Sequence, residues 1–291
     1  MNWLIVFVLL INIGVPSHSK SNFELRKMKI MDLSPTQSSV GVAAVNVKKD
    51  MLSQMDDLQL EEYLKNHPVP LVLAPNSKYY LVDHHHLCTA LLSLNIGETY
   101  VEIWDLSQYE NGIKKIEKKG SKSKIKSAKD EKTMDQKMDE FWRQMKNNKF
   151  VYLKEQGKTT IAPKDLPSSI LDLQDDPFRS FAYFFRDFGG YKKVSIPFLE
   201  FMWGDFLRGV MSLSDIKMPM TVAELTIMKK VMLGEKVLDP SNEIERSLIP
   251  FYGKVNEALQ HAKTPGAVRL PGSKYKTGSK YRKNGCYKFY Y

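Results

Sequence analysis

Hydrophobic and polar residues in the first half of the chain form the short alternating or continuous apolar runs that are typical of β-strands. One helix is expected among them, from about Lys48 to Asn66, and it ends where Pro68 and Pro70 can no longer donate backbone hydrogen bonds. The runs that predict strands are Met28–Leu33, Val69–Leu73, Tyr79–Val82 and Tyr100–Asp105. Residues 28–106 therefore predict a small α+β unit.

The second half of the chain shows the periodicity of helices instead. A helix with one apolar face is expected after Met134, and Phe150–Leu153 predicts a strand or an extended entry. Gly189-Gly190 is typical of a helix C-terminus. The later helices are expected over about Pro177–Phe188, Pro197–Met211, Val222–Leu233 and Asn242–His261. Residues 134–270 are therefore predicted to be mostly α-helical.

The N-terminus has the features of a targeting segment. Leu4–Val15 is an apolar stretch of the length of a signal-peptide core, and Ser17 and Ser19 supply small residues before a cleavage point. We expect a signal peptide over residues 1–19 with cleavage after Ser19; an uncleaved anchor is the alternative. Either way the body of the protein is predicted to be exported, as a secreted or periplasmic protein.

Charge and cysteine content narrow the partners and the chemistry. The net charge of +10 favours polyanionic partners such as nucleic acid or nucleotides. Much of this charge lies in a Lys-rich stretch, expected to be a linker or loop over 107–133, and in a basic aromatic tail over 271–291. The two cysteines, Cys88 and Cys286, do not form a disulfide framework, and Cys88 is expected to be a buried small hydrophobe.

Potentially catalytic or ligand-binding side chains are most concentrated in the run Asp83-His84-His85-His86, which lies between a predicted strand and a predicted helix. Such a junction offers free backbone N–H groups and a helix dipole, so an anion can bind there with a histidine as acid, base or donor. Two alternatives stay open. His84 and His86 can bind a metal together with Asp83, or Asp83 caps the helix while the imidazoles bond the backbone. Arg179 and Asp176, near the start of a later helix, are candidates for the same anion site.

Three stretches of the chain form a recognisable set: Met31–Gly41, His67–Leu73 and Tyr80–Leu91. Together they resemble the ParB/sulfiredoxin superfamily, and most closely its branch of ParB-like nucleases. The likeness continues through Phe141-Trp142, the run from Asp175 to Ser180, and the run from Pro197 to Asp205, so it covers most of the chain between the signal peptide and the tail.

This resemblance implies a ParB/sulfiredoxin-like N-terminal unit over 20–106 and a phosphate-handling turn. His84 stands where the family turn has glycine, and Leu87 stands where it has arginine. We therefore predict a phosphate-binding set and a catalytic set. The phosphate-binding residues are His84, Thr36, Gln37 and Arg179, and the catalytic residues are His85, His86 and Asp83. No metal ligand or cofactor is assigned.

The leading hypothesis is an exported ParB-like protein that binds nucleic acid or a nucleotide at this turn and cleaves phosphodiesters. A nucleotide-dependent phosphotransferase is the second hypothesis, although Gln37 stands where kinase-like relatives have an acidic base. The third is a non-enzymatic binding module in which the histidines are structural. The fold class that we predict is α+β with a mostly helical C-terminal half.

Overall fold

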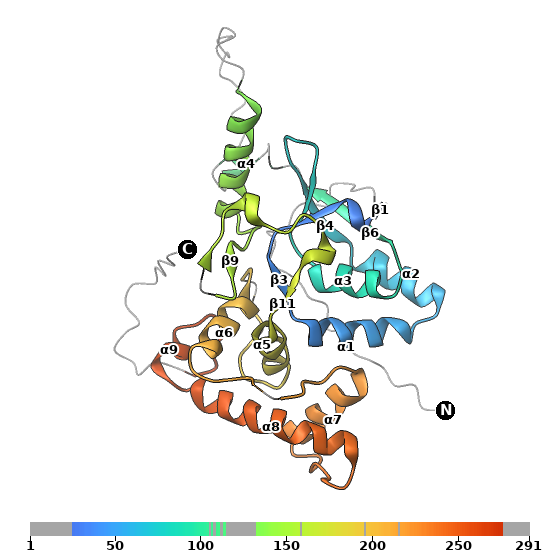
Figure 1. Ribbon diagram of the computed structural model, residues 1–291, viewed down its shortest axis with the longest axis vertical. Coiled ribbons are helices and arrows are strands. Elements are labelled where there is room, and N and C mark those ends of the chain that lie inside the picture. The colour runs from blue at the N-terminus through green and yellow to red at the C-terminus, as the bar shows by residue number, and fades with distance from the viewer. Residues whose placement is uncertain are drawn as a thin grey trace.

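A mixed five-stranded sheet forms the centre of the N-terminal half in the computed structural model (Figure 1). Its strand order is β1-β6-β4-β5-β2, with β2 parallel to β5 and β4 antiparallel to β5. Because β2 and β5 are parallel, the chain leaves both strands at the same edge of the sheet. The strands are β1 (Arg26–Lys29), β2 (Leu33–Pro35), β4 (Val69–Leu73), β5 (Tyr79–Leu81) and β6 (Glu98–Trp104).

Residues 25–104, 106, 109–110, 113–114, 132–157, 159–194, 196–214 and 216–275 are described by the structure. The predicted signal peptide with its cleavage point, most of the Lys-rich segment 107–133, most of the tail 271–291, and Cys286 lie outside these residues. Those calls and the domain boundaries stay predictions.

Each face of the sheet packs on its own layer of helices. Leu71 and Leu81 point to one face, which is covered by α1 (Val42–Ser53), α2 (Asp57–Asn66) and α3 (His85–Ser93). Val72 and Tyr80 alternate with them and point to the other face, where they pack on α4 (Met134–Asn147). Short strands flank these layers: β3 (Ser39–Val40), β7 (Tyr109–Glu110), β8 (Ile113–Lys114), β9 (Lys154–Glu155), β10 (Thr159–Thr160) and β11 (Gln174–Asp175).

The C-terminal half is built around an aromatic core. Phe181, Phe184, Trp203 and Phe251 are fully buried in it, and small residues of α1 pack against the same cluster. Helix α1 contacts α3, α5 and α7, so it joins the two halves (Figure 1). The helices of this half are α5 (Pro177–Asp187), α6 (Leu199–Arg208), α7 (Val222–Met232), α8 (Glu243–His261) and α9 (Pro265–Val268).

The predicted α+β class and the helical second half are confirmed, and two element predictions were wrong in detail. The single helix over Lys48–Asn66 is two helices, because the Asp56 side chain caps α2 in a capping box with Gln59. A 3₁₀ turn over Ile30–Asp32 interrupts the strand predicted over Met28–Leu33. Of the two alternatives for Phe150–Leu153, the strand does not form there, and the segment leads into β9, which begins at Lys154.

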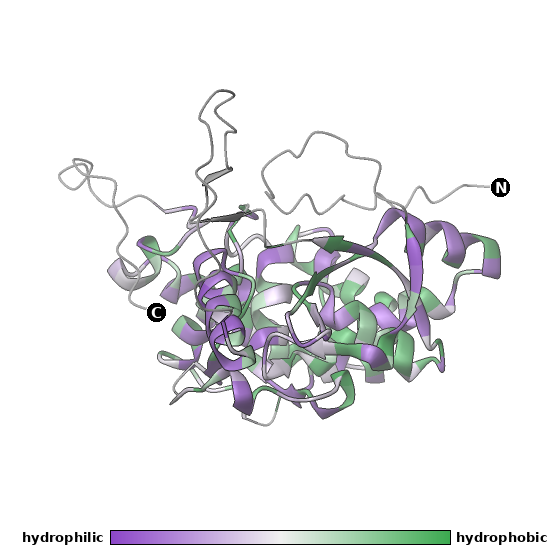
Figure 2. Ribbon diagram, turned by 90° about the horizontal axis from the view of Figure 1, so that it is seen from above, coloured by the Kyte–Doolittle hydropathy of each residue, from purple (hydrophilic) through white to green (hydrophobic). Residues whose placement is uncertain are grey.

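Hydropathy follows this layering: green positions lie mainly where elements meet, and purple ones mainly on outward-facing helical surfaces (Figure 2). Within the described ranges, no helix combines the length and the apolar character that crossing a membrane requires.

Candidate functional site

The histidine run lies at the sheet edge where β2 and β5 both end. Strand β5 leads into Asp83 and His84, and α3 starts at His85. His84 is the N-cap residue of α3 with φ 68°, so it adopts the left-handed conformation that the family glycine would favour. The replacement of glycine therefore does not prevent this turn.

Asp83 does not cap α3, contrary to one of the alternatives drawn from the sequence. Its Oδ1 instead accepts a hydrogen bond from the N–H of His84 at 2.6 Å. Among the described residues, no side chain caps the N-terminus of α3. The first turn of this helix therefore keeps backbone N–H groups that no side-chain cap occupies.

His85 and His86 each accept a hydrogen bond from a backbone N–H of another segment. Thr36 N–H donates to His85 Nε2 at 3.2 Å, and Gly41 N–H donates to His86 Nε2 at 3.1 Å. An accepting Nε2 carries no proton, so each neutral ring holds its proton on Nδ1. Within the described part of the chain neither Nδ1 has a hydrogen-bond partner. Each ring thus joins two segments of the chain through Nε2 and offers a hydrogen-bond donor at Nδ1.

Burial keeps these imidazoles neutral. Burial and then the nearby Arg179 charge lower the pKa of His85 to about 3. The same two causes lower the pKa of His86 well below its ordinary value. Burial also lowers the pKa of His84, although the Asp83 carboxylate opposes that shift. All three rings are therefore neutral near pH 7.

Arg179 comes to this turn because α5 packs directly on the start of α1. Ser180 Oγ accepts a hydrogen bond from Ala44 N–H at 3.2 Å, and Gly41 leaves the space that Ser180 fills. The adjacent Arg179 guanidinium lies 4.7 Å from the centre of the Phe201 ring. Its Nε and Nη1 are buried and make no hydrogen bond in the described chain.

Glu200 neutralises part of this positive charge. Its carboxylate pairs with Arg186, and its Oε2 lies 3.5 Å from Arg179 Nη1. Burial opposes ionisation of Glu200, but Arg179 and Arg186 outweigh it and hold the pKa below the ordinary value. Asp205, five residues further on, instead accepts a hydrogen bond from Tyr152 OH at 2.7 Å. The two carboxylates therefore have different partners and do not form a pair.

The side chains of Thr36 and Gln37, two of the predicted phosphate-binding residues, are buried. Thr36 Oγ1 donates to Leu81 O at 2.6 Å, and Gln37 Nε2 donates to Ser39 O at 2.7 Å. Their side-chain donors are therefore engaged within the chain. Their predicted contact with phosphate stays a prediction that would require these bonds to break.

Asp176 holds the helix that carries Arg179. Its carboxylate caps α5 by accepting from the N–H groups of Phe178 and Arg179, and both oxygens accept from Arg208 Nη2 at 2.7–2.8 Å. This pair is nearly buried, with 3% of the Asp176 side chain exposed. Asp176 is therefore the N-cap of α5, and its ion pair is internal rather than on the surface.

Lys48 and Lys193 also reach this turn, and nothing in their sequence context indicated it. Lys48 lowers the pKa of His84 and of His86, after the larger effect of burial. Burial lowers the pKa of Lys193, and Asp83 opposes that shift. Their placement depends on how α1 and the loop after α5 pack, which no local motif records.

Metal and thiol chemistry find no support among the described residues. No group of three or more His, Cys, Asp or Glu side chains there is arranged to hold a metal ion. Cys88 is buried as expected, and burial raises the pKa of its thiol to about 12. Such a thiol stays protonated and unreactive.

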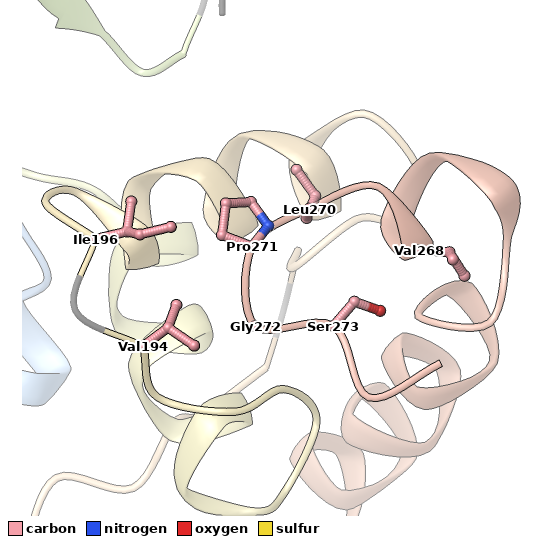
Figure 3. A pocket seen from close by; sticks show the side chains of 7 residues that line it. All are labelled: Val194, Ile196, Val268, Leu270, Pro271, Gly272 and Ser273. Carbon is pink, nitrogen blue, oxygen red and sulfur yellow. The ribbon is translucent and has the colours of Figure 1, made fainter. Parts of the chain in front are cut away.

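A separate hollow lies between the loop before α6 and the segment that follows α9 (Figure 3). None of the side chains that line it titrates, and none belongs to the predicted site. The lining residues are Val194, Ile196, Val268, Leu270, Pro271, Gly272 and Ser273.

Comparison with known proteins gives a family and a solved structure that the chain resembles. Residues 26–209 match the model of the family described as "Putative ParB-like nuclease". The chain is also similar to the crystal structure of protein Atu1540 from Agrobacterium tumefaciens, with 28% sequence identity and a TM-score of 0.58. That similarity covers 87% of this chain and 98% of the other. No curated protein matches the chain.

Proposed function

The chain belongs to the family of ParB-like nucleases, and from that premise we propose that it binds the phosphate of a nucleic acid or nucleotide at the Asp83–His86 turn and hydrolyses a phosphodiester there. One observation carries the proposal. Two imidazole Nδ1–H groups without hydrogen-bond partners in the described chain lie at a helix N-terminus, and the Arg179 guanidinium, whose Nε and Nη1 make no hydrogen bond there, acts electrostatically on both rings. Phosphate oxygens accept hydrogen bonds from such donors.

The geometry narrows the roles predicted from the sequence. A general base needs a free lone pair, and the Nε2 lone pairs of His85 and His86 are occupied by backbone N–H groups. These two residues fit as donors to phosphate. His84 is neutral and makes no ring hydrogen bond in the described chain, so it fits better as the base.

The proposed reaction is a direct hydrolysis. His84 accepts a proton from a water molecule while the water oxygen bonds to phosphorus. The bond between phosphorus and the leaving sugar oxygen breaks, and that oxygen takes a proton from solvent. Asp83 favours the protonated His84 ring electrostatically, and the donors stabilise the charge that develops on the phosphate.

Cleavage of labelled oligonucleotides by the purified chain tests this proposal. With and without added divalent cations, His84→Ala is expected to lower the rate by at least about 100-fold, the contribution of a positioned acid or base. His261→Ala is the matched control, because that ring lies at the end of α8 and is partly exposed. Equal rates for wild type and His84→Ala, at equal melting temperatures, would refute the assignment of His84.

A non-enzymatic binding module is the second candidate, and the two backbone hydrogen bonds of His85 and His86 favour it. In that case the chain binds oligonucleotides without cleaving them. His84→Ala then leaves both affinity and melting temperature unchanged, while His85→Ala lowers the melting temperature.

A further inference from the structure

Several aromatic and basic side chains lie near the Asp83–His86 turn. Strands β4 and β5 are antiparallel neighbours, and Val82 N–H donates to Pro70 O at 3.1 Å. His67, three residues before Pro70, therefore lies beside the chain that leads into His84. The charge of His67 also contributes to the lowered pKa of His84, after burial and Lys48.

His67 is part of a ready-made ring stack. Its imidazole lies on the ring of Tyr63, one turn earlier in the chain, with centroids 4.1 Å apart and planes 21° apart. His67 Nδ1 is 2.7 Å from the backbone oxygen of Tyr63, and this contact fixes the imidazole. Both residues are partly exposed, so the stack borders solvent.

Lys48 connects this stack to the turn. Its Nζ donates to Tyr63 OH at 3.2 Å and lies 5.8 Å from the centre of that ring. The same ammonium group acts electrostatically on His84 and His86. The Lys48 ammonium group therefore contacts the aromatic stack and also acts on the turn that carries the proposed phosphate donors.

Helix α5 adds a further aromatic ring near the stack. Arg186 lies 4.9 Å from the centre of the Tyr183 ring. Burial and the Asp187 carboxylate raise the pKa of Tyr183 to about 12, and Tyr63 contributes to that rise. The two phenols thus lie within electrostatic reach of each other.

From this arrangement we infer that the site takes a ligand whose unpaired nucleobase lies next to its phosphate. The base extends the Tyr63–His67 stack, while Lys48 and the turn hold the phosphate. The inference rests on the proposed function, because it needs a phosphate at the turn. A mononucleotide and a single strand share this chemistry, whereas a duplex keeps its bases paired and stacked.

Tyr100 provides a matched control on the same half of the protein. It also has two lysines over its ring, with Lys27 at 5.0 Å and Lys65 at 5.7 Å from its centre. Its hydroxyl, however, donates to the Glu61 carboxylate, which repels phosphate. If any tyrosine beside a lysine attracted nucleic acid, both Tyr100 and the Tyr63–His67 stack would contribute to binding. A specific site for a base would need only the Tyr63–His67 stack.

Fluorescence anisotropy of the full chain at one fixed ionic strength tests the inference. The ligands are a short oligothymidylate, an abasic strand of the same length, the corresponding duplex, and thymidine monophosphate as a competitor. Wild type should bind the oligothymidylate about 5- to 150-fold more tightly than the abasic strand, the range of one base–aromatic stack. His67→Leu should bring that ratio near one, and His67→Phe should restore it. Tyr100→Leu should leave it unchanged.

Each result separates the inference from the proposed function. Equal affinity of the wild-type chain for both strands overturns the inference and leaves phosphate binding intact. Absence of binding to every phosphate ligand overturns both. Competition by thymidine monophosphate supports a mononucleotide ligand, and its failure with a retained strand ratio supports a single strand. If His67→Leu does not fold, the ratio of affinities for the oligothymidylate and the abasic strand, measured for wild type and for His67→Phe, still tests the inference.

Discussion

Acidification should remove the stability that His85 and His86 give to the fold. Both rings accept a backbone N–H at Nε2, and burial lowers the pKa of both. Protonation of either ring turns this acceptor into a donor that faces another donor. The folded state therefore excludes a proton that the unfolded chain takes up below its ordinary histidine pKa near 6.5.

The magnitude follows from the proton balance. A histidine that stays neutral in the folded state lowers the free energy of unfolding by about 1.4 kcal/mol for each pH unit below 6.5. Because the pKa of His85 is about 3 in the folded protein, its contribution is full above pH 6.5 and is lost as pH falls from 6.5 to about 3. Between pH 6.5 and 4.5, His85 and His86 together account for up to about 5 kcal/mol. Such a loss is comparable to the whole stability of many domains.

Urea unfolding across this pH range measures the effect. His85→Gln and His86→Gln are the informative variants, because a glutamine amide oxygen can replace Nε2 as an acceptor but does not titrate. Between pH 6.5 and 4.5, the free energy of unfolding of the double variant should fall by up to about 5 kcal/mol less than that of wild type. His261→Gln should follow wild type. Parallel curves for wild type and the double variant would show that the rings are not buried neutral acceptors.

Other predictions concern the packing that positions Arg179, and urea unfolding measures each of them. Gly41→Ala should lower the free energy of unfolding by about 1–3 kcal/mol, because its Cβ would lie 2.5 Å from Ser180 N and 2.8 Å from Ser180 Cα; an unchanged value would mean that α1 and α5 separate easily. Arg208→Met should cost about 3–5 kcal/mol by leaving Asp176 buried without its cation, and a neutral outcome would contradict this pairing. Tyr152→Phe should cost about 1.5 kcal/mol through the lost hydrogen bond to a carboxylate; a gain in stability would refute it.

Much of the fold could be predicted because local patterns and tertiary packing agree. The continuous apolar runs Val69–Leu73 and Tyr79–Leu81 match a sheet that is covered on both faces. The run from Pro177 to Asp187 has a proline start, an Asp176 cap and a glycine end, and it forms one helix as predicted. Periodicity alone does not show the break at Asp56, because the apolar spacing continues across it while the Asp56 side chain starts a new helix.

The site could be predicted only in part, for a physical reason. The strand–histidine–helix junction is a local feature of the sequence, and the structure places it at a sheet edge. Which imidazole nitrogen is free depends on Thr36 and Gly41, which lie about 50 residues away in the chain. The ring stack of Tyr63 and His67 lies beside the histidine run only because β4 pairs with β5. Long-range contacts of this kind leave no local signature.

The affinity of the Arg179→Met variant for a labelled oligonucleotide tests the central claim most directly. Arg143→Met is the matched control, because Arg143 is an exposed arginine on α4 that pairs with Glu140. Loss of a charge-assisted bond of about 1.5–3 kcal/mol to phosphate predicts at least a tenfold weaker binding by Arg179→Met, measured at a temperature where both variants are folded. Arg143→Met should bind like wild type. Equal affinities of the two variants would show that phosphate does not bind at the Asp83–His86 turn.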